Sequence, residues 1–439
     1  MCPHRLAVCS STTNRSRFFA GFVLVATTAP ASSGVAAPPL DEGAAARRVC
    51  AEGPAAAAAR AERLRGEAAV TAAGVLPNPS LSIQHQRTLS GPAESETVVG
   101  LSVPLGLGGQ RFLLQDAARA LREQARSEAH ATRFDAALAF REAYVAAAAE
   151  EARLAVLTRQ QAALDALSGT IERLARGGES TSYDLLRQRT QARVHGRLLA
   201  SARARAAASR VLLAAWTGEA VTLSPEGLAK LAGGPAAQAA AIAQRGATPA
   251  PPRLRGLEAA ARARELEAEA ARRRWIPDVE VFAGYRALSG ATQETGHGLS
   301  LGLTVPLTFF DHGQGDAARA DAEQAVALAA AAGLKRESAA RAETASARLG
   351  ILEAGLAEIE RAVAEAAALE SQAGRLYAAG EASIAELLDA LRAAEEAQLA
   401  RIDLLEEIAL ARLAWMRATG TMLDATLDHA CGDAVGGTR

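Results

Sequence analysis

The chain has 439 residues, of which 49% are hydrophobic, 22% are charged and only 4% are aromatic, and its formal net charge is −1. This length allows two or three ordinary domains, and the balanced charge gives no reason to expect a nucleic acid or an anionic surface as a partner. Long tracts rich in alanine, arginine and glutamate favour long helices. The composition therefore predicts a mainly helical protein.

Residues 1–37 have the pattern of an export signal. Arg15 and Arg17 precede the apolar segment FFAGFVLV at residues 18–25, which is too short to cross a bilayer. Small residues follow, and VAA at residues 35–37 fits a cleavage site. We therefore predict that a signal peptide is removed and that the mature chain enters an oxidising compartment.

The cysteines are distributed between this signal and the two ends of the mature chain. Cys2 and Cys9 would leave with the signal, whereas Cys50 and Cys431 would remain. An oxidising compartment permits one disulfide between the remaining two. Two unpaired thiols are the alternative, and the sequence leaves both open.

The chain is an internal duplication. Three residue pairs share a separation of 202 positions: Pro104 and Pro306, Gly178 and Gly380, and Gly218 and Gly420. Each half is predicted to run helix, β-hairpin, long helix, tight turn and return helix. We divide the mature chain into residues 38–75 as an N-terminal helical segment, 76–218 as repeat 1, 219–252 as a connector with one short helix, 253–420 as repeat 2 and 421–439 as a C-terminal tail.

Each half opens with a helix, at residues 54–73 and 252–275. In the segments that follow, apolar residues alternate with small or polar residues with a period of two. In LSLGLTVPL at 299–307, apolar residues alternate with small or polar ones, which is typical of a strand with one apolar and one polar face. VGLSVPL at 99–105 is the earlier copy. The partner strands are predicted at 81–86 and 279–285, across loops at 88–96 and 288–297, so that the hairpins span 79–106 and 278–308.

After each hairpin, proline disappears from the sequence. None occurs between Pro104 and Pro225, and none after Pro306. Because an internal proline costs about 3 kcal/mol in a helix, these tracts permit very long helices. Residues 112–175 would form a helix of about 96 Å and residues 316–377 one of about 93 Å. Such helices need lateral packing, and their many alanines predict a coiled-coil-like arrangement.

Tight turns at residues 176–182 and 378–383 end the long helices, and return helices then run to about 217 and 419. Gly178 and Gly380 are suited to stop a helix. Ser383 with Glu386 forms a capping-box pattern, and Thr181 with Asp184 is a weaker version of it.

No pattern of an enzyme site is present in the sequence. It has no phosphate loop, nucleophile elbow or HExxH motif, and GHG at 296–298 precedes a predicted strand rather than a helix. No two histidines are spaced i,i+4 and none lies in a cysteine–histidine cluster; those outside the signal are His85, His130, His195, His297, His312 and His429. Metal ligation needs several convergent ligands, so we expect no metal site, no cofactor and no enzymatic activity.

The hairpins of one chain would supply four strands. In lipid an open sheet edge is costly, because each unpaired backbone group costs several kcal/mol. The smallest bacterial barrels have about 8 strands. If these strands lie in lipid, several copies of the chain must share one barrel. Two copies would give eight strands and three would give twelve, and physical reasoning leaves both open.

The duplicated helix–hairpin–long helix–turn–helix order resembles TolC-type outer-membrane efflux proteins. The resemblance extends over residues 54–420 and includes LPNPSL at 76–81, SVPL at 102–105, TVPLTFFDHGQG at 304–315 and, at the tip turn, GEASIAELLDA at 380–390. It implies a homotrimer in the outer membrane of a Gram-negative bacterium, with a twelve-stranded barrel in lipid that continues into an α-helical tunnel across the periplasm. It also implies a periplasmic adaptor and an inner-membrane pump, of the RND type, as partners.

The resemblance implies a passive exit duct for small molecules or metal cations. PLTFFDHGQG at 306–315 is similar to the heavy-metal cation branch of the family. Residues 40–50 depart from the family pattern, because the helix there is expected to be short and broken by Gly43 and Gly53. The alternative function is a periplasmic coiled-coil structural or adaptor protein without a pore, for which four matched apolar strand faces would have no use.

Two groups of residues follow as candidates from this resemblance. The bend from barrel to tunnel is assigned to Pro104, Gly108, Gly109, Pro306, Gly313 and Gly315, since glycine permits a sharp bend. Adaptor docking at the periplasmic tip is assigned to Gly178, Glu179, Thr181, Asp184, Gly380, Glu381, Ser383 and Glu386. Within this second group, Glu179 and Glu381 are the exposed candidates, whereas for Asp184 and Glu386 we favour a capping role over a ring of negative charge.

Overall fold

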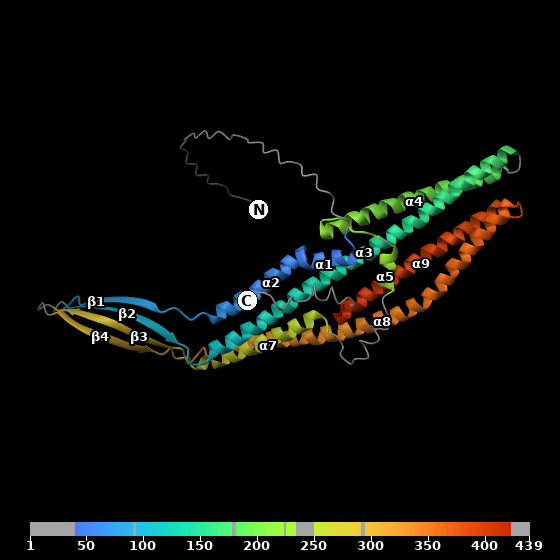
Figure 1. The fold of residues 1–439 in the computed structure, drawn as a ribbon. Helices are drawn as coiled ribbons and strands as arrows, with labels where there is room; N and C mark the ends of the chain where they lie inside the picture. Colours follow the sequence, from blue (N-terminus) through green and yellow to red (C-terminus); the bar gives the residue numbers. More distant parts are fainter. Residues whose placement is uncertain are drawn as a thin grey trace, which may run out of the picture. The chain divides into compact units, whose positions relative to one another are not determined.

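The structure is a computed structural model that describes residues 40–90, 94–177, 181–223, 225–233, 250–290 and 295–422. The chain divides into two units, Met1–Pro38 and Pro39–Arg439. The signal peptide predicted for residues 1–37 lies outside the described residues. In the second unit, the strands lie at one end of the long helices and the turns that join these helices lie at the other end (Figure 1).

The order of elements repeats once along the chain, as the duplication predicts. The first half comprises α1 (Glu42–Glu52), α2 (Pro54–Gly74), β1 (Ser80–Arg87), β2 (Ser95–Leu105), α3 (Gln110–Gly177) and α4 (Ser182–Thr217). A short helix of the connector follows, α5 (Pro225–Ala232). The second half comprises α7 (Pro252–Arg272), a 3-10 turn (Arg273–Trp275), β3 (Val279–Ser289), β4 (Thr295–Thr304), α8 (Gln314–Ala378) and α9 (Ile384–Thr419).

The two long helices are slightly longer than the sequence predicts. Helix α3 has 68 residues and α8 has 65, so that α3 extends about 102 Å at ~1.5 Å per residue. Helix α3 packs against α2, α4 and α7, and α8 packs against α7 and α9. No helix in the described part combines the length and the apolar character needed to span a bilayer.

The main hydrophobic core lies where α1, α3, α4, α5, α8 and α9 meet. Phe140 and Tyr144 of α3, Leu213 of α4 and Ile408 of α9 belong to one buried cluster, and the remaining α3 positions in it are largely alanine. Small side chains let the helix axes approach closely. A second cluster near the turns contains Leu164 of α3 together with residues of α8 and α9, so both helical hairpins contribute to it.

The strands start and end differently from the sequence prediction. Strand β2 begins at Ser95 rather than at 99, and it stays paired there because Ser95 lies opposite Ser289 of β3. Backbone pairing needs no apolar side chain, which is why the period-two signal failed to find the polar ends of these strands. Strand β4 ends at Thr304, not at 307, since Pro306 has no N–H to donate to a ladder.

Helix α1 is short, as expected, but Gly43 does not interrupt it. The helix begins after Asp41, whose Oδ1 atom accepts a hydrogen bond from Ala44 N at 2.5 Å. Glu42 of this first turn pairs with Arg141 Nε of α3 at 2.7 Å, and Arg141 is buried. Gly53, with extended backbone, ends α1 and precedes α2.

Candidate functional site

The four strands form one antiparallel sheet in the order β1-β2-β3-β4. Its register places the odd-numbered residues of all four strands on one face, and one row across the sheet is Leu81, Leu101, Ala283 and Leu301. The next row is Ile83, Val99, Tyr285 and Leu299. This apolar face is open to the surroundings, with Leu299 86% exposed and Leu301 80% exposed.

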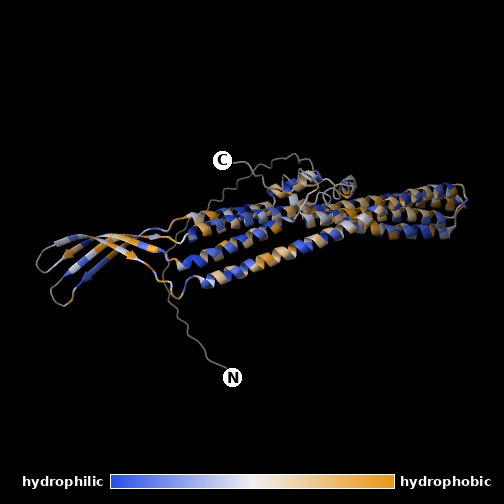
Figure 2. Cartoon of the chain, turned by 90° about the horizontal axis from the view of Figure 1, so that it is seen from below, coloured by the Kyte–Doolittle hydropathy of each residue, from blue (hydrophilic) through white to orange (hydrophobic). Residues whose placement is uncertain are grey.

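The opposite face of the sheet is polar and hollowed. Across it the register aligns Ser82, Gly100, Gly284 and Ser300. A hollow of about 490 Å³ lies on this face, lined among others by Gln84, Glu96, Glu280, Phe282 and Thr304. Glu96 Oε1 pairs with Arg286 Nη1 at 3.4 Å. The colouring in Figure 2 shows hydrophilic and hydrophobic residues interspersed along the strands, and the register separates them into the two faces.

One aromatic side chain interrupts the polar face. Phe282 lies beside three glycines, and a β-carbon on Gly100, Gly284 or Gly302 would lie 2.4, 2.8 or 3.4 Å from an atom of Phe282. Only glycine on the neighbouring strand leaves space for the ring against the sheet. Sequence alone does not predict this arrangement, because nothing in the segments around Gly100 and Gly284 indicates that both glycines face the same ring.

The sheet has two unpaired edges within the described residues. Strand β1 pairs only with β2, and β4 pairs only with β3. The outer edges of β1 and β4 therefore present backbone N–H and C=O groups without a strand partner in this chain. An apolar face combined with open edges is unfavourable in lipid unless further strands close the sheet.

The strand-to-helix junctions contain two of the predicted bend glycines in the left-handed conformation. Gly109 has φ +66° and Gly313 has φ +89°. A β-carbon on Gly313 would lie 2.1 Å from Ala271 O, so this position requires glycine. Gly315 is different, because it lies in the first turn of α8 with open space around it. The chain has already entered the helix at Gly315, so the assignment of this residue to the bend stays a prediction.

The two prolines and Gly108 lie beside these glycines. Pro104 is opposite Glu280 in β3, but β1 begins too late to reach it, so its missing N–H leaves no gap in a ladder. Gly108 has a side-chain neighbour, Gln110. The Nε2 atom of Gln110 donates to Arg273 O at 2.9 Å and to Ile276 O at 3.2 Å, which ties the start of α3 to the end of α7.

The sheet end of the helices also carries exposed aromatic side chains. Phe309 is 76% exposed and Phe310 is 91% exposed. Both follow β4, where the apolar face of the sheet ends. Two adjacent phenylalanines with this exposure are unfavourable in water. Exposed aromatic residues at the end of a sheet are typical of the aromatic girdle of a membrane barrel.

At the other end of the helices, both turns form the predicted capping boxes. Asp184 N donates to Thr181 Oγ1 at 3.1 Å, and Thr181 N donates to Asp184 Oδ2 at 3.3 Å. Glu386 N donates to Ser383 Oγ at 3.3 Å, and Ser383 N donates to Glu386 Oε2 at 2.6 Å. The bond from the Ser383 backbone lowers the pKa of Glu386 below the usual value. The capping role favoured for Asp184 and Glu386 is confirmed.

The turn after α8 has the backbone conformation of a helix that ends at a glycine. Gly380 has φ +74°, and the N–H of Glu381 donates to Leu376 O at 2.9 Å, as in a Schellman motif. Glu381 is exposed. The corresponding Gly178 and Glu179 lie outside the described residues. Burial, and then the negative charge of Asp184, raise the pKa of Tyr377, so the two hairpins lie close together here.

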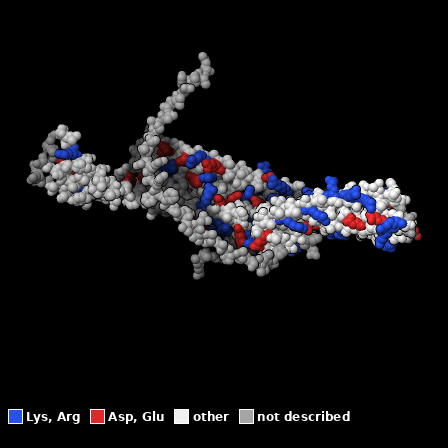
Figure 3. Space-filling model, turned by 90° about the horizontal axis from the view of Figure 1, so that it is seen from above, with Lys and Arg blue, Asp and Glu red and all other residues white. Residues whose placement is uncertain are grey.

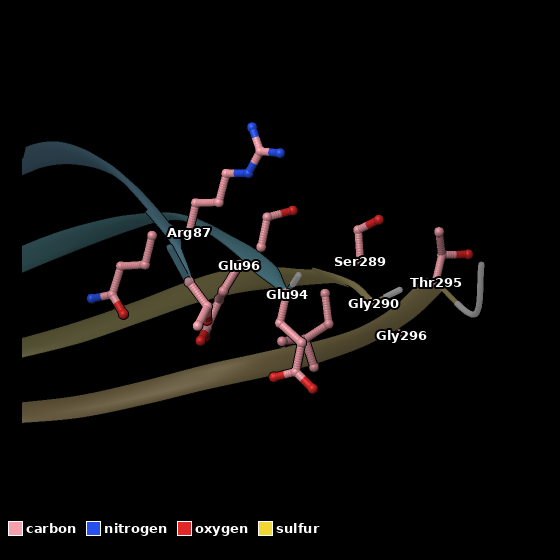
Figure 4. A pocket seen from close by; sticks show the side chains of 11 residues that line it. Arg87, Glu94, Glu96, Ser289, Gly290, Thr295 and Gly296 are labelled. Atoms are coloured by element: carbon pink, nitrogen blue, oxygen red, sulfur yellow. The ribbon is translucent and has the colours of Figure 1, made fainter. Parts of the chain in front are cut away.

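Charged side chains also gather at the turn end of the sheet and along the helices. A hollow of about 560 Å³ lies where the strand ends meet, lined by residues such as Arg87, Glu94, Glu96 and Thr295. In Figure 4 the side chains of Arg87 and Glu94 point in opposite directions. Along the helices, acidic and basic side chains are interspersed on the face shown in Figure 3. In the described residues no three His, Cys, Asp or Glu side chains gather where they could hold a metal ion.

Cys50 lies in the main core at the end of α1 and is disulfide-bonded. Its partner is not among the described residues, and Cys431 lies outside them as well. The pairing of Cys50 with Cys431 therefore stays a prediction.

Comparison with known proteins connects this geometry to a family. The family model of outer membrane efflux proteins matches residues 250–421. The fold is similar to that of the outer membrane protein VceC from Vibrio cholerae, with a TM-score of 0.66 and 16% sequence identity over 87% of this chain and 97% of that chain. No curated protein sequence matches the chain significantly.

Two further solved structures have the same fold. The CmeC outer membrane channel of Campylobacter jejuni is similar with a TM-score of 0.67 and 10% identity, over 89% of each chain. The open state of the MtrE outer membrane channel of Neisseria gonorrhoeae has a TM-score of 0.65 and 15% identity, over 86% of this chain and 88% of that chain. The fold is therefore that of outer-membrane channels of this kind, and the second half of the sequence carries the pattern of outer membrane efflux proteins.

Proposed function

We propose that this protein is the outer-membrane channel of a tripartite efflux system, a passive exit duct rather than an enzyme. The single observation that carries the proposal is the two-faced sheet, whose apolar face is exposed and whose polar face is hollowed. An exposed apolar face is what a strand presents to lipid, and a polar inner face lines a water-filled lumen. The match to outer membrane efflux proteins and the fold support it.

In this proposal three copies of the chain close the barrel. The outer edges of β1 and β4 would pair between neighbouring copies, so that four strands from each chain give twelve. The same association would continue the two repeats, residues 76–218 and 253–420, into a helical tunnel. Exposed apolar residues on the long helices, such as Val211 of α4, Val326 and Ile351 of α8, would then face a neighbouring copy.

The tips of the helical hairpins would dock a periplasmic adaptor, which connects the duct to an inner-membrane pump of the RND type. Glu381 is exposed on its turn and takes no part in the capping box, so its carboxylate is free to meet a cationic partner. Glu179 would have the same role in the first repeat. The cargo would be a small molecule or a metal cation selected by the pump, since the described residues offer no metal-binding cluster.

The alternative is a periplasmic coiled-coil structural protein without a pore. The long helices alone would suit it, but the sheet favours the channel. A water-soluble sheet would not leave uncovered the apolar face that all four strands share.

The proposal is tested with two substitutions on neighbouring residues that face opposite sides of the sheet. Leu301→Arg places a charge on the apolar face, which costs about 2–4 kcal/mol if that face lies in lipid. Ser300→Arg places the same charge on the polar face. We expect Leu301→Arg to abolish recovery in the outer-membrane fraction, and Ser300→Arg to be inserted but to change single-channel conductance in planar bilayers. Equal recovery of both variants as soluble protein would contradict the proposal.

Adaptor docking is tested by reversing charge at the turns. In the double variant Glu179→Arg, Glu381→Arg, chemical cross-linking to the adaptor should fall while insertion and conductance stay normal. Glu396→Arg, an exposed charge on α9 away from the turn, is the matched control. Unchanged cross-linking in the double variant would remove the assignment of these two residues and leave the channel proposal intact.

A further inference from the structure

A buried histidine and a glutamate face each other where the hairpin of α3 and α4 packs against the hairpin of α8 and α9. His195 of α4 is 2% exposed. Its Nε2 atom lies 3.4 Å from Oε1 of Glu395 in α9, and the side chain of Glu395 is 12% exposed. One turn nearer to the tip, Arg392 of α9 donates to Gln191 of α4 at 3.3 Å. Polar side chains therefore make up part of the contact between the two hairpins.

A neighbouring glutamine of α3 determines which ring nitrogen of His195 carries a hydrogen. Gln161 Nε2 donates to Asp165 Oδ1 at 2.8 Å, so its Oε1 atom is the one turned toward His195. An amide oxygen only accepts, and it lies 3.0 Å from His195 Nδ1. Nδ1 must therefore be the donor, and in the neutral ring Nε2 then has no hydrogen.

The contact between His195 and Glu395 is attractive only when a proton lies between them. An unprotonated Nε2 and an ionised carboxylate are both acceptors, and buried acceptors that face each other repel. Among the described residues, the only group that faces Nε2 of His195 is this carboxylate at 3.4 Å, and Nε2 makes no other hydrogen bond to them. One proton, on the ring or on the carboxyl group, converts the contact into a charge-assisted or neutral hydrogen bond.

We propose that His195 and Glu395 form a proton-dependent clasp that holds the two helical hairpins together and weakens when the shared proton is lost. The other charged groups near the pair in the described residues are Arg392 and Glu396 of α9 and Asp165 of α3, which acts through Gln161. Independently, burial raises the pKa of Glu395, although the nearby His195 partly opposes this rise.

The direction of the pH effect follows from linkage. When the hairpins separate, both side chains enter water, where a histidine releases its proton at about pH 6.5. The packed pair binds one proton more tightly than the separated groups, so packing is favoured at low pH and the advantage is lost as the pH rises. In the proposed channel these hairpins form the periplasmic end of the tunnel, so their packing would respond to the pH of that compartment.

Hydrogen exchange measured by mass spectrometry tests the clasp in the purified full-length protein. Rates are followed from pH 6 to pH 9 and corrected for the intrinsic pH dependence of exchange. In the wild type, protection of peptides spanning 188–199 and 391–399 should fall by up to about tenfold per pH unit, because one proton is linked to opening. In Glu395→Gln the amide can donate to Nε2 at every pH, so the protection should become independent of pH.

Glu396→Gln is the matched control, because it removes the same charge one residue away on the exposed side of α9. It should keep the pH dependence of the wild type. Equal pH dependence in wild type and Glu395→Gln would overturn the proposal, as would its loss in Glu396→Gln. If Glu395→Gln does not fold, His195→Gln is measured instead, and its hydrogen-exchange protection should likewise be independent of pH. The readout needs no transport, adaptor or pump, so its outcome is independent of the proposed channel function.

Discussion

The ring of Phe282 occupies the space that a side chain on Gly100 would need. A β-carbon on Gly100 would lie 2.4 Å from Cζ of Phe282, which is closer than side-chain atoms approach. The two residues lie on neighbouring strands, β2 and β3, and on the polar face of the sheet. This relationship keeps a bulky apolar ring flat against the sheet instead of extended across the hollow in front of it.

We expect Gly100→Ala to destabilise the protein by about 1–3 kcal/mol, the usual cost of an overpacked site, measured by denaturant unfolding in detergent. Gly298→Ala is the control, because a β-carbon there meets no atom within 4 Å. In a Phe282→Ala background, Gly100→Ala should cost less stability than it does in the wild type. Some cost should remain, because a β-carbon on Gly100 would also lie 2.7 Å from the Cα atom of Gly284. Equal stability of Gly100→Ala and Gly298→Ala would show that the ring is free to move away.

At the junction between strand and helix, Gly313 and Gly315 should respond in opposite ways to alanine. Gly313 has φ +89° and a β-carbon there would lie 2.1 Å from Ala271 O, so Gly313→Ala should cost more than about 1–2 kcal/mol. Gly315 is helical with open space around it, so Gly315→Ala should stabilise by about 0.5–1 kcal/mol. Thermal unfolding followed by circular dichroism measures both. A destabilising Gly315→Ala would support the assignment of Gly315 to the bend.

Stability at the second tip turn should depend on pH through Glu386. The hydrogen bond from the Ser383 backbone lowers the pKa of this carboxyl group from its usual 4.5. A lowered folded-state pKa means that the contribution is complete above about pH 4.5 and is lost as the pH falls through the folded-state pKa. Ser383→Ala keeps the backbone N–H but removes the hydroxyl, whose hydrogen bond to Glu386 Oε2 at 2.9 Å also lowers this pKa. The acid dependence should therefore weaken in Ser383→Ala, measured as the thermal midpoint between pH 3 and pH 6, whereas Glu381→Gln should leave it unchanged. An unchanged profile in Ser383→Ala would contradict the capping role.

The disulfide of Cys50 should connect it to Cys431. Reduction should then change the mobility of the purified mature protein on a denaturing gel, and peptide mapping should recover the two cysteines in one linked peptide. Cys50→Ser and Cys431→Ser should each abolish the shift and lower stability by about 2–5 kcal/mol, since the bond closes a very long loop. A shift that survives in Cys431→Ser would assign the bond to another partner.

Much of the fold follows from local signals that are repeated in the sequence. The capping boxes at Thr181 and Ser383, the glycine stop at Gly380 and the proline-free tracts fixed the ends of the helices to within a few residues. The strand faces were predictable because their leucines alternate, and a period of two places them on one side.

Features that depend on pairing between distant residues could not be predicted. Helix α4 gives no sign that His195 meets Glu395, since 200 positions separate them and each looks like an ordinary residue of a charged helix. Phe282 and Gly100 meet because of a register that no local pattern determines. The start of β2 at Ser95 could not be predicted for the same reason. Backbone pairing with β3, and not hydropathy, determines where this strand begins.

The proposed channel needs several copies of the chain, because its sheet cannot close within one chain. Native mass spectrometry of the purified full-length protein, released from detergent micelles, measures the number of chains directly. With a mass of 45.3 kDa for the 439-residue chain, we predict particles that contain three chains. Particles that contain a single chain, with β1 and β4 still unpaired at their outer edges, would contradict it.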